Sequence, residues 1–127
     1  IRLLIELPED TVPAVCCDPQ RIRQVLAILL HNALSYTPRN GQVRLSLLYD
    51  DKTVQLLVAD NGIGISDEEK PRIFERFYRA DQARSAKGHF GLGLCIASEI
   101  IHAHQGKILV SDTPGGGSTF TVILYTS

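Results

Sequence analysis

The side chains best suited to bind a charged ligand are an asparagine, an aspartate and the backbone of several glycine-rich stretches. Asn32 lies within a helical pattern of apolar residues, and at ~100° per residue it falls about 80° from the centre of the apolar stripe. At the edge of that stripe a carboxamide oxygen can ligate Mg²⁺, which prefers oxygen donors. The alternative is a partly buried asparagine that caps or bridges the backbone.

Asp60 closes an apolar strand pattern and opens the stretch 60–65, which reads Asp-Asn-Gly-Ile-Gly-Ile. A carboxylate in such a position is costly to bury unless it meets a hydrogen-bond donor, and the exocyclic amine of adenine is such a donor. Gly62 and Gly64 would allow a planar base to approach the backbone. The alternative is a solvated aspartate at a strand end, followed by a turn.

A second glycine-rich stretch, 88–94, reads Gly-His-Phe-Gly-Leu-Gly-Leu and opens a helical pattern. Free N–H groups and the helix dipole favour negative charge at a helix start, so a triphosphate suits it, with Arg84 and Lys87 just before. No Gly-Lys-Ser/Thr follows, which excludes a P-loop, and no strand immediately precedes, which excludes a dinucleotide fingerprint. The alternative is a flexible loop with solvated basic residues.

A third stretch, 115–119, leads from glycines into the last strand pattern. Thr119 can hydrogen-bond to a purine, directly or through water. Its parity opposes that of Phe120, Val122 and Leu124, so the two sets must face opposite sides of the sheet. The sequence leaves open which set faces a pocket, and a plain loop-to-strand junction is the alternative.

The elements that position these groups begin with a strand at about 2–7 and a helix from Pro19 to about Tyr36. Asp18 before Pro19 is typical of a helix start. A β-hairpin is predicted from two alternating runs, 43–49 and 54–58, joined by 50–52. The predicted core stripe of the helix consists of Ile22, Leu26, Leu29 and Ala33.

The second half of the chain is predicted to contain a short helix at 68–74 and a loop at 80–88. A helix then runs from near Gly91 to about His104, with Gly106 as its stop signal. Strands at 107–111 and 119–125 follow. This order predicts an α+β fold: a two-layer sandwich with a mixed, mostly antiparallel sheet and helices on one face.

The composition favours one domain over 1–127, with 44% hydrophobic and 21% charged residues around an ordinary core. A net charge of −1 gives no field that would attract nucleic acid or an anionic membrane. No apolar run is long enough to span a bilayer. Because the chain lacks methionine and opens directly on a strand pattern, we expect a fragment of a longer protein.

The cysteines and histidines are weak candidates for a metal site. The three cysteines have no metal-ligand spacing, and their odd number fits a reduced setting. His102 and His104 form a His-x-His pair that could bind a metal. The alternative is a polar helix end that interacts favourably with the helix dipole.

Together these motifs resemble the ATP-binding domain shared by sensor histidine kinases, DNA gyrase, Hsp90 and MutL. The resemblance covers nearly the whole chain, and five motifs follow in the family's order. They are similar to the N box at 24–37, the first glycine box at 60–65, the F box at 73–79, the second glycine box at 88–94 and the last glycine box at 115–120.

The resemblance implies a Bergerat-type sandwich with ATP between the helices and the sheet. Asp60 would read adenine, Asn32 would be the Mg²⁺ ligand, and Arg79 with the loop 80–90 would approach the phosphates as a lid. Asn32 and Arg79 would serve catalysis. The implied ATP site consists of Asn32, Tyr36, Asp60, Gly62, Gly64, Ile65, Phe77, Arg79, Lys87, Gly88, Gly91, Leu92, Gly93, Leu94 and Thr119.

Four positions depart from the family pattern. The kinases usually carry asparagine where this chain has Ile28, and lysine where it has Ser35. His89 and Phe90 replace smaller residues. The gyrase-like branch carries a glutamate at the position of Ile28, and isoleucine cannot act as a general base. Together with the F box, Ile28 favours the kinase branch.

The resemblance implies a histidine kinase that transfers the γ-phosphoryl group of Mg-ATP to a histidine on a separate dimerisation domain. Its implied partners are its own phosphoacceptor helices, in a homodimer, and a response regulator, with no nucleic acid and no direct membrane contact. The domain would be cytoplasmic, within a parent protein anchored in the bacterial cell membrane. The alternatives are a degenerate nucleotide-binding or docking module and a serine kinase similar to anti-sigma factors.

We predict that the isolated chain does not phosphorylate itself. None of His31, His89, His102 or His104 is followed by the Glu/Asp and Pro pattern that the family uses at its phosphoacceptor. Incubation with γ-labelled ATP should leave the 127-residue chain unlabelled. Detection of phosphohistidine on it would contradict the prediction.

Overall fold

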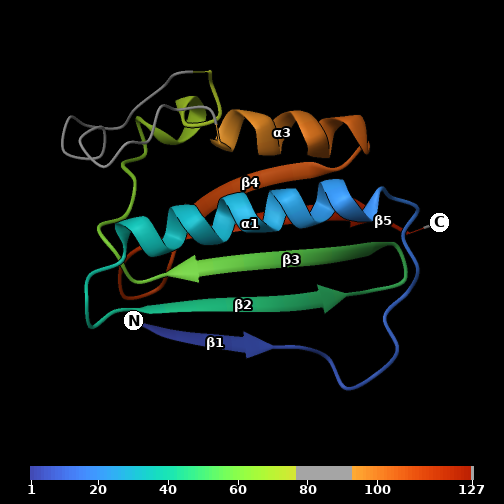
Figure 1. The fold of residues 1–127 in the computed structure, drawn as a ribbon, viewed down its shortest axis with the longest axis horizontal. Helices are drawn as coiled ribbons and strands as arrows, with labels where there is room; N and C mark the ends of the chain where they lie inside the picture. Colours follow the sequence, from blue (N-terminus) through green and yellow to red (C-terminus); the bar gives the residue numbers. More distant parts are fainter. Residues whose placement is uncertain (77–92, 127) are drawn as a thin grey trace.

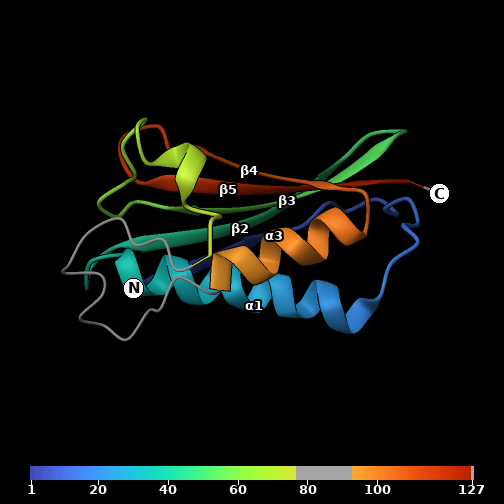
Figure 2. The same cartoon turned by 90° about the horizontal axis from the view of Figure 1, so that it is seen from above.

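The computed structural model describes residues 1–76 and 93–126, which form a five-stranded sheet with two helices on one face (Figure 1, Figure 2). The strands are β1 (Arg2–Glu6), β2 (Gln42–Tyr49), β3 (Thr53–Asp60), β4 (Lys107–Asp112) and β5 (Ser118–Tyr125). The helices are α1 (Pro19–Tyr36) and α3 (Gly93–Ala103), with a 3₁₀ turn, η1 (Lys70–Arg72). The order is β1-β2-β3-β5-β4, and only the β1–β2 pair is parallel among these strands. The predicted two-layer α+β sandwich is confirmed.

Helix α1 begins where the sequence predicts, because Asp18 accepts hydrogen bonds from the backbone N–H groups of Gln20 (3.1 Å) and Arg21 (3.4 Å). The buried stripe of α1 differs from the predicted core stripe. Val25 is fully buried with Leu29 and Ala33, whereas the predicted Ile22 and Leu26 are only half-buried. The reason is that α1 contacts α3 as well as the sheet, so its core-facing stripe is turned toward both.

Phe120 is the centre of the core and has no exposed surface. It lies opposite Val58 in the β3–β5 register, and the ring of Phe74 meets it edge-on, with ring centroids 6.1 Å apart. Val122 and Leu124 are buried with Phe120 on the side of the helices. The parity that the sequence left open is thereby decided, and Thr119 faces the other side of the sheet.

The hairpin prediction is confirmed, and the predicted first strand ends one residue early, at Glu6. The predicted helix at 68–74 is wrong, since only η1 forms there. Pro71 lacks an N–H group and cannot continue an α-helical hydrogen-bond ladder through this segment. The predicted loop at 80–88 and the start of the second helix near Gly91 lie outside the described residues. No helix in residues 1–76 or 93–126 is long and apolar enough to cross a membrane.

Gly106 has a different role from the predicted helix stop. The residue with left-handed backbone after α3 is Gln105, at φ 60°, and the N–H of Gly106 donates to the carbonyl of Ile101 (2.9 Å). A Cβ on Gly106 would lie 2.5 Å from the carbonyl oxygen of Ile123. Gly106 is therefore required by the close packing of the chain against β5.

Substitutions at these two adjacent positions should change stability in opposite directions. Gly106→Ala should lower the free energy of unfolding by about 1–3 kcal/mol, because its Cβ meets backbone that cannot move aside. Gln105→Gly should raise it by about 0.5–1 kcal/mol, because the left-handed conformation carries no penalty for glycine. Urea denaturation of the two variants and the wild type measures both. A stable Gly106→Ala variant would show that β5 yields at this point.

Candidate functional site

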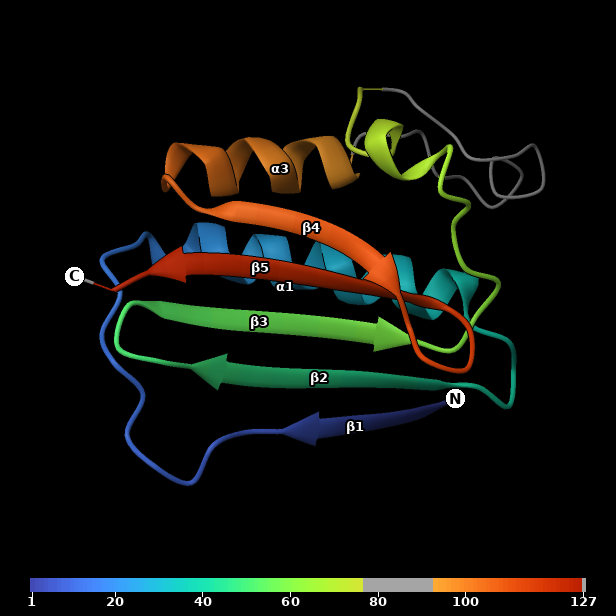
Figure 3. The same ribbon diagram turned by 180° about the vertical axis from the view of Figure 1, so that it is seen from behind.

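Four segments that are far apart in the sequence meet at one end of the sandwich. The C-terminal ends of α1 and β3, the start of α3 and the turn between β4 and β5 all lie at this end (Figure 1, Figure 3). These segments carry the predicted N box, the first and last glycine boxes, and Gly93 and Leu94, the described part of the second glycine box. The fold therefore brings the motifs together although the N box lies in the first third of the chain and the last glycine box close to its end.

Asp60 is the buried polar centre of this end. Its side chain is 5% exposed, and Oδ1 accepts hydrogen bonds from the N–H of Gly62 (2.9 Å) and the N–H of Ser118 (3.2 Å). Within residues 1–76 and 93–126, Oδ2 accepts no hydrogen bond. A buried carboxylate needs donors for both oxygens, so the carboxylate is prepared for one more N–H group. The exocyclic amine of adenine has the matching chemistry.

Glycines allow the chain to close tightly around Asp60. A Cβ on Gly62 would lie 2.2 Å from the carbonyl oxygen of Tyr36, and a Cβ on Gly117 would lie 2.0 Å from that of Asp60. Gly64 and Gly117 also have left-handed backbones, at φ 77° and 101°. The sequence prediction explained Gly62 by the approach of a base, whereas the structure shows that it is required by the end of α1.

Ser118 replaces Thr119 as the strand residue next to Asp60. The β3–β5 register pairs Thr119 with Ala59, on the face opposite Asp60, and the hydroxyl of Thr119 lies 2.9 Å from that of Thr113. Ser118 is 5% exposed and shares the parity of Phe120. The predicted purine contact of the Thr119 side chain is thus corrected. The alternation of β5 already predicted that Ser118 and Phe120 share one face of the sheet. It could not predict which face the helices cover.

Asn32 is half-buried and lies one helical turn after Ile28, the residue of α1 that faces the start of α3. Helices α1 and α3 are antiparallel, because Ile28 approaches Gly93 while Asp18 approaches His104. Asn32 follows Ile28 by one helical turn, roughly 6 Å along the axis and on the same side. It therefore extends past Gly93, the first described residue of α3, and the N-terminus of a helix favours an anion.

Lys70 ties the segment after the first glycine box to the end of β4. Its ammonium pairs with the carboxylates of Asp67 and, at 2.9 Å, Asp112. The hydrogen bond from Lys70 holds the pKa of Asp67 below its ordinary value, and the hydrogen bonds to Asp67 and Asp112 raise the pKa of Lys70. Asp67 and Lys70 therefore stay charged at neutral pH. An open hollow of about 540 Å³ beside this network is lined by Ile63, Gly64, Ile65, Ser66, Asp112, Thr113, Gly116 and Gly117.

The other predicted site residues divide into two groups. Gly93 and Leu94 form the first turn of α3, Tyr36 ends α1, and Ile65 is buried behind the glycine loops. The remaining predicted contacts lie outside the described residues. They are Phe77, Arg79, Lys87, Gly88, Gly91 and Leu92.

The histidine pair at the end of α3 fits the helix-end interpretation. His104 Nε2 accepts from the N–H of Asp18 (3.0 Å), and its Nδ1 lies 2.8 Å from the carbonyl oxygen of Ile100. His102 Nδ1 lies 3.4 Å from the hydroxyl of Ser98. In the described part of the chain, no group of three or more His, Cys, Asp or Glu residues is placed to hold a metal ion.

Comparison with known proteins places this arrangement in a family. The model of the histidine kinase-, DNA gyrase B- and HSP90-like ATPases matches residues 17–126. The chain therefore belongs to this family. Within this family, the chain is an ATP-binding catalytic domain of the sensor histidine kinase type, as its similarity to one sensor protein and to two solved kinase structures shows.

The sensor protein CiaH of Streptococcus pneumoniae is 43% identical over 109 residues, which are 85% of this chain and 24% of CiaH. The nucleotide-free catalytic domain of the histidine kinase ThkA superposes with a TM-score of 0.84 at 28% identity, covering 98% of this chain and 80% of ThkA's. Full-length ShkA in complex with AMPPNP gives a TM-score of 0.81 at 28% identity, and the match covers 99% of this chain and 26% of the ShkA chain. The chain spans about a quarter of CiaH.

Asp60→Asn should weaken adenine binding by about 10- to 100-fold, the value of a hydrogen bond to a charged group. Asparagine keeps an oxygen for the N–H groups of Gly62 and Ser118 but places an NH₂ group where the open carboxylate oxygen was. Isothermal titration with ADP, beside a melting curve of the variant, measures the effect. Unchanged affinity in a folded variant would refute the role of Asp60. Asp67→Asn, on the surface, is the matched control.

Proposed function

We propose that the chain binds Mg-ATP and transfers its γ-phosphoryl group to a histidine of a separate dimerisation domain. The observation that carries the proposal is the buried carboxylate of Asp60, which has one oxygen bound by two backbone N–H groups and the other without a donor in the described part of the chain. Adenine offers an N–H donor at the edge that such an oxygen recognises. ShkA, which shares this fold, has been crystallised with the ATP analogue AMPPNP.

Asn32 supports the metal and phosphate part of the proposal. Its amide oxygen is suited to Mg²⁺, and one protein ligand is sufficient because Mg²⁺ usually keeps several waters and binds substrate phosphates. Ile28, one turn earlier, is apolar and packs against the core, so it supplies no second ligand. When bound, the ion would neutralise charge on the phosphate oxygens.

The chain's own part in the transfer is positioning. Asp60 would hold the purine, and the first N–H groups of α3 would face the phosphates beside Asn32. The imidazole nitrogen of the acceptor forms a bond to the γ-phosphorus as the bridging oxygen bond breaks, and ADP leaves with that electron pair. Arg79 and the loop 80–90 remain predicted phosphate contacts.

The partners follow from the same proposal. An acceptor histidine on a helical dimerisation domain implies a homodimeric parent protein, and a response regulator would receive the phosphoryl group. The parent would be anchored in the bacterial membrane with this domain in the cytoplasm. These assignments rest on the relatives, since the chain corresponds to about a quarter of CiaH.

One observation favours a second candidate, a degenerate nucleotide-binding or docking module. Ile28 removes a polar group from the phosphate end, which lowers the number of protein ligands for Mg²⁺. Titration of the chain with ATP and ADP, with and without Mg²⁺, separates the candidates. The kinase domain should bind both nucleotides, and ATP more tightly with Mg²⁺. No binding of either nucleotide at millimolar concentration would instead support the docking module.

We expect Mg²⁺ to raise the affinity of the wild type for ATP about tenfold, and Asn32→Ala should remove this increase. The affinity for ADP without metal should stay within about twofold of the wild type. The amide oxygen is the proposed metal ligand, whereas Asp60 holds the purine in both conditions. Calorimetric titrations in Mg²⁺ and in EDTA measure the two affinities. Ser35→Ala, in the next turn of the same helix, is the control. A full Mg²⁺ effect in Asn32→Ala would exclude Asn32 as the ligand.

A further inference from the structure

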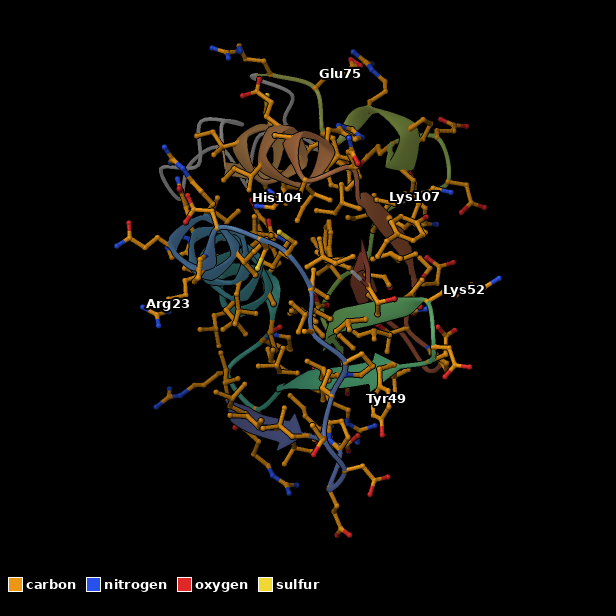
Figure 4. The ribbon with its side chains drawn as sticks, turned by 90° about the vertical axis from the view of Figure 1, so that its right-hand side faces the viewer. Arg23, Tyr49, Lys52, Glu75, His104 and Lys107 are labelled. Atoms are coloured by element: carbon orange, nitrogen blue, oxygen red, sulfur yellow. The ribbon has the colours of Figure 1, made fainter. Side chains whose placement is uncertain are left out.

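Helices α1 and α3 are joined by a hydrogen bond at the end far from the site. The backbone N–H of Asp18, the N-cap of α1, donates to Nε2 of His104 (3.0 Å). Nδ1 of His104 lies 2.8 Å from the carbonyl oxygen of Ile100, which can only accept, so Nδ1 carries the proton. The His104 side chain thus connects the N-cap of α1 to a carbonyl in the last turn of α3. Figure 4 shows it at the end of α3, next to the start of α1.

At the end near the site, the two helices approach so closely that an added side chain would force its neighbour to shift by a few tenths of an ångström. A Cβ on Gly93, the first residue of α3, would lie 3.3 Å from Cγ2 of Ile28. Ile28 is half-buried and packs against the core, so the β-branched methyl group is held in place. The start of α3 is therefore stopped against a fixed apolar contact.

The two contacts have matching spacings on the two helices. They are separated by ten residues along α1 and by eleven along α3, which is roughly 15 Å and roughly 16 Å of helix. A slide of α3 along α1 would break the hydrogen bond at one end and change the packing at the other. Together they define the axial position of α3.

We propose that Ile28 and His104 are positioning residues for the phosphate end of the site. They hold the start of α3 at a fixed axial position, one helical turn from Asn32, so that both face the same phosphates. The proposal rests on the proposed function and adds to it a reason for an isoleucine at position 28. Where the family resemblance implies a polar metal ligand, Ile28 supplies a methyl group that limits the approach of α3.

The proposal is tested first with Gly93→Ala and Ile28→Leu in the 127-residue chain. Gly93→Ala should raise the Kd for ATP about tenfold, because its methyl group moves α3 away from Ile28, and leave adenosine binding within about twofold. Leucine keeps the volume of isoleucine but has no methyl group at Cγ2. The double variant should therefore bind ATP more tightly than Gly93→Ala alone. If Ile28→Leu gives no recovery, the methyl group added at position 93 obstructs the phosphates directly, and the proposal is overturned.

A second series tests the far end and does not depend on Gly93→Ala being folded. His104→Ala should weaken ATP binding about threefold without changing adenosine binding, since its cavity and lost hydrogen bond free the end of α3. His104→Gln offers an amide oxygen near the place of Nε2 and should recover the affinity. His102→Ala is the control. Equal losses for ATP and adenosine, or no recovery with glutamine, would reduce His104 to a general structural role and overturn the proposal.

The wild-type chain and Asp60→Asn separate this proposal from the function on which it rests. If the wild type binds ATP and Asp60→Asn does not, the proposed nucleotide site stands, and the two series decide the role of Ile28 and His104 alone. If the wild type binds no nucleotide, the proposed function fails and the positioning role fails with it.

Discussion

The structure depends most on the burial of one carboxylate. Removing the charge of Asp60 from water carries a large cost unless donors replace the water, and the N–H groups of Gly62 and Ser118 do so at a single oxygen. Because both donors are backbone N–H groups, the conformation of the loops around Gly62 and Ser118 determines these hydrogen bonds. The β3–β5 register brings Ser118 to it, and glycines at 62 and 117 allow the chain to approach closely enough. The open oxygen is a consequence of that geometry.

The helical layer has a separate role, which is to hold the start of α3, the proposed phosphate-binding end of the site. Residues Val25, Leu29 and Ala33 fasten α1 to the core, whose centre is Phe120. Helix α3 is in turn fastened to α1, by Ile28 near the site and by His104 at the far end. The sheet thus positions Asp60, the proposed purine contact, and the contact between the helices positions the proposed phosphate end. Substitutions in one part can change one end and leave the other.

Ile28 belongs both to the contact between the helices and to the proposed phosphate end of the site. At this position the related kinases usually carry an asparagine, and the gyrase-like branch carries a glutamate. An isoleucine there removes a polar group but supplies a rigid methyl contact to the start of α3. The proposed loss of a metal ligand is accompanied by a contact with the start of α3, and Asn32 is the amide that we propose as the ligand of the ion.

Local chemistry was sufficient for much of the fold and part of the site. Asp18 before Pro19 determined the start of α1, two alternating runs determined the hairpin, and an aspartate ahead of spaced glycines marked a polar strand end that the structure buries, because each of these signals acts within a few residues. Only the tertiary structure decided that Ser118 and not Thr119 accompanies Asp60, that Val25 is central in α1, and that Gly106 is needed against Ile123. Each of these facts depends on which face of an element meets a partner far away in the chain, and strand parity or helical period alone carries no information about that partner.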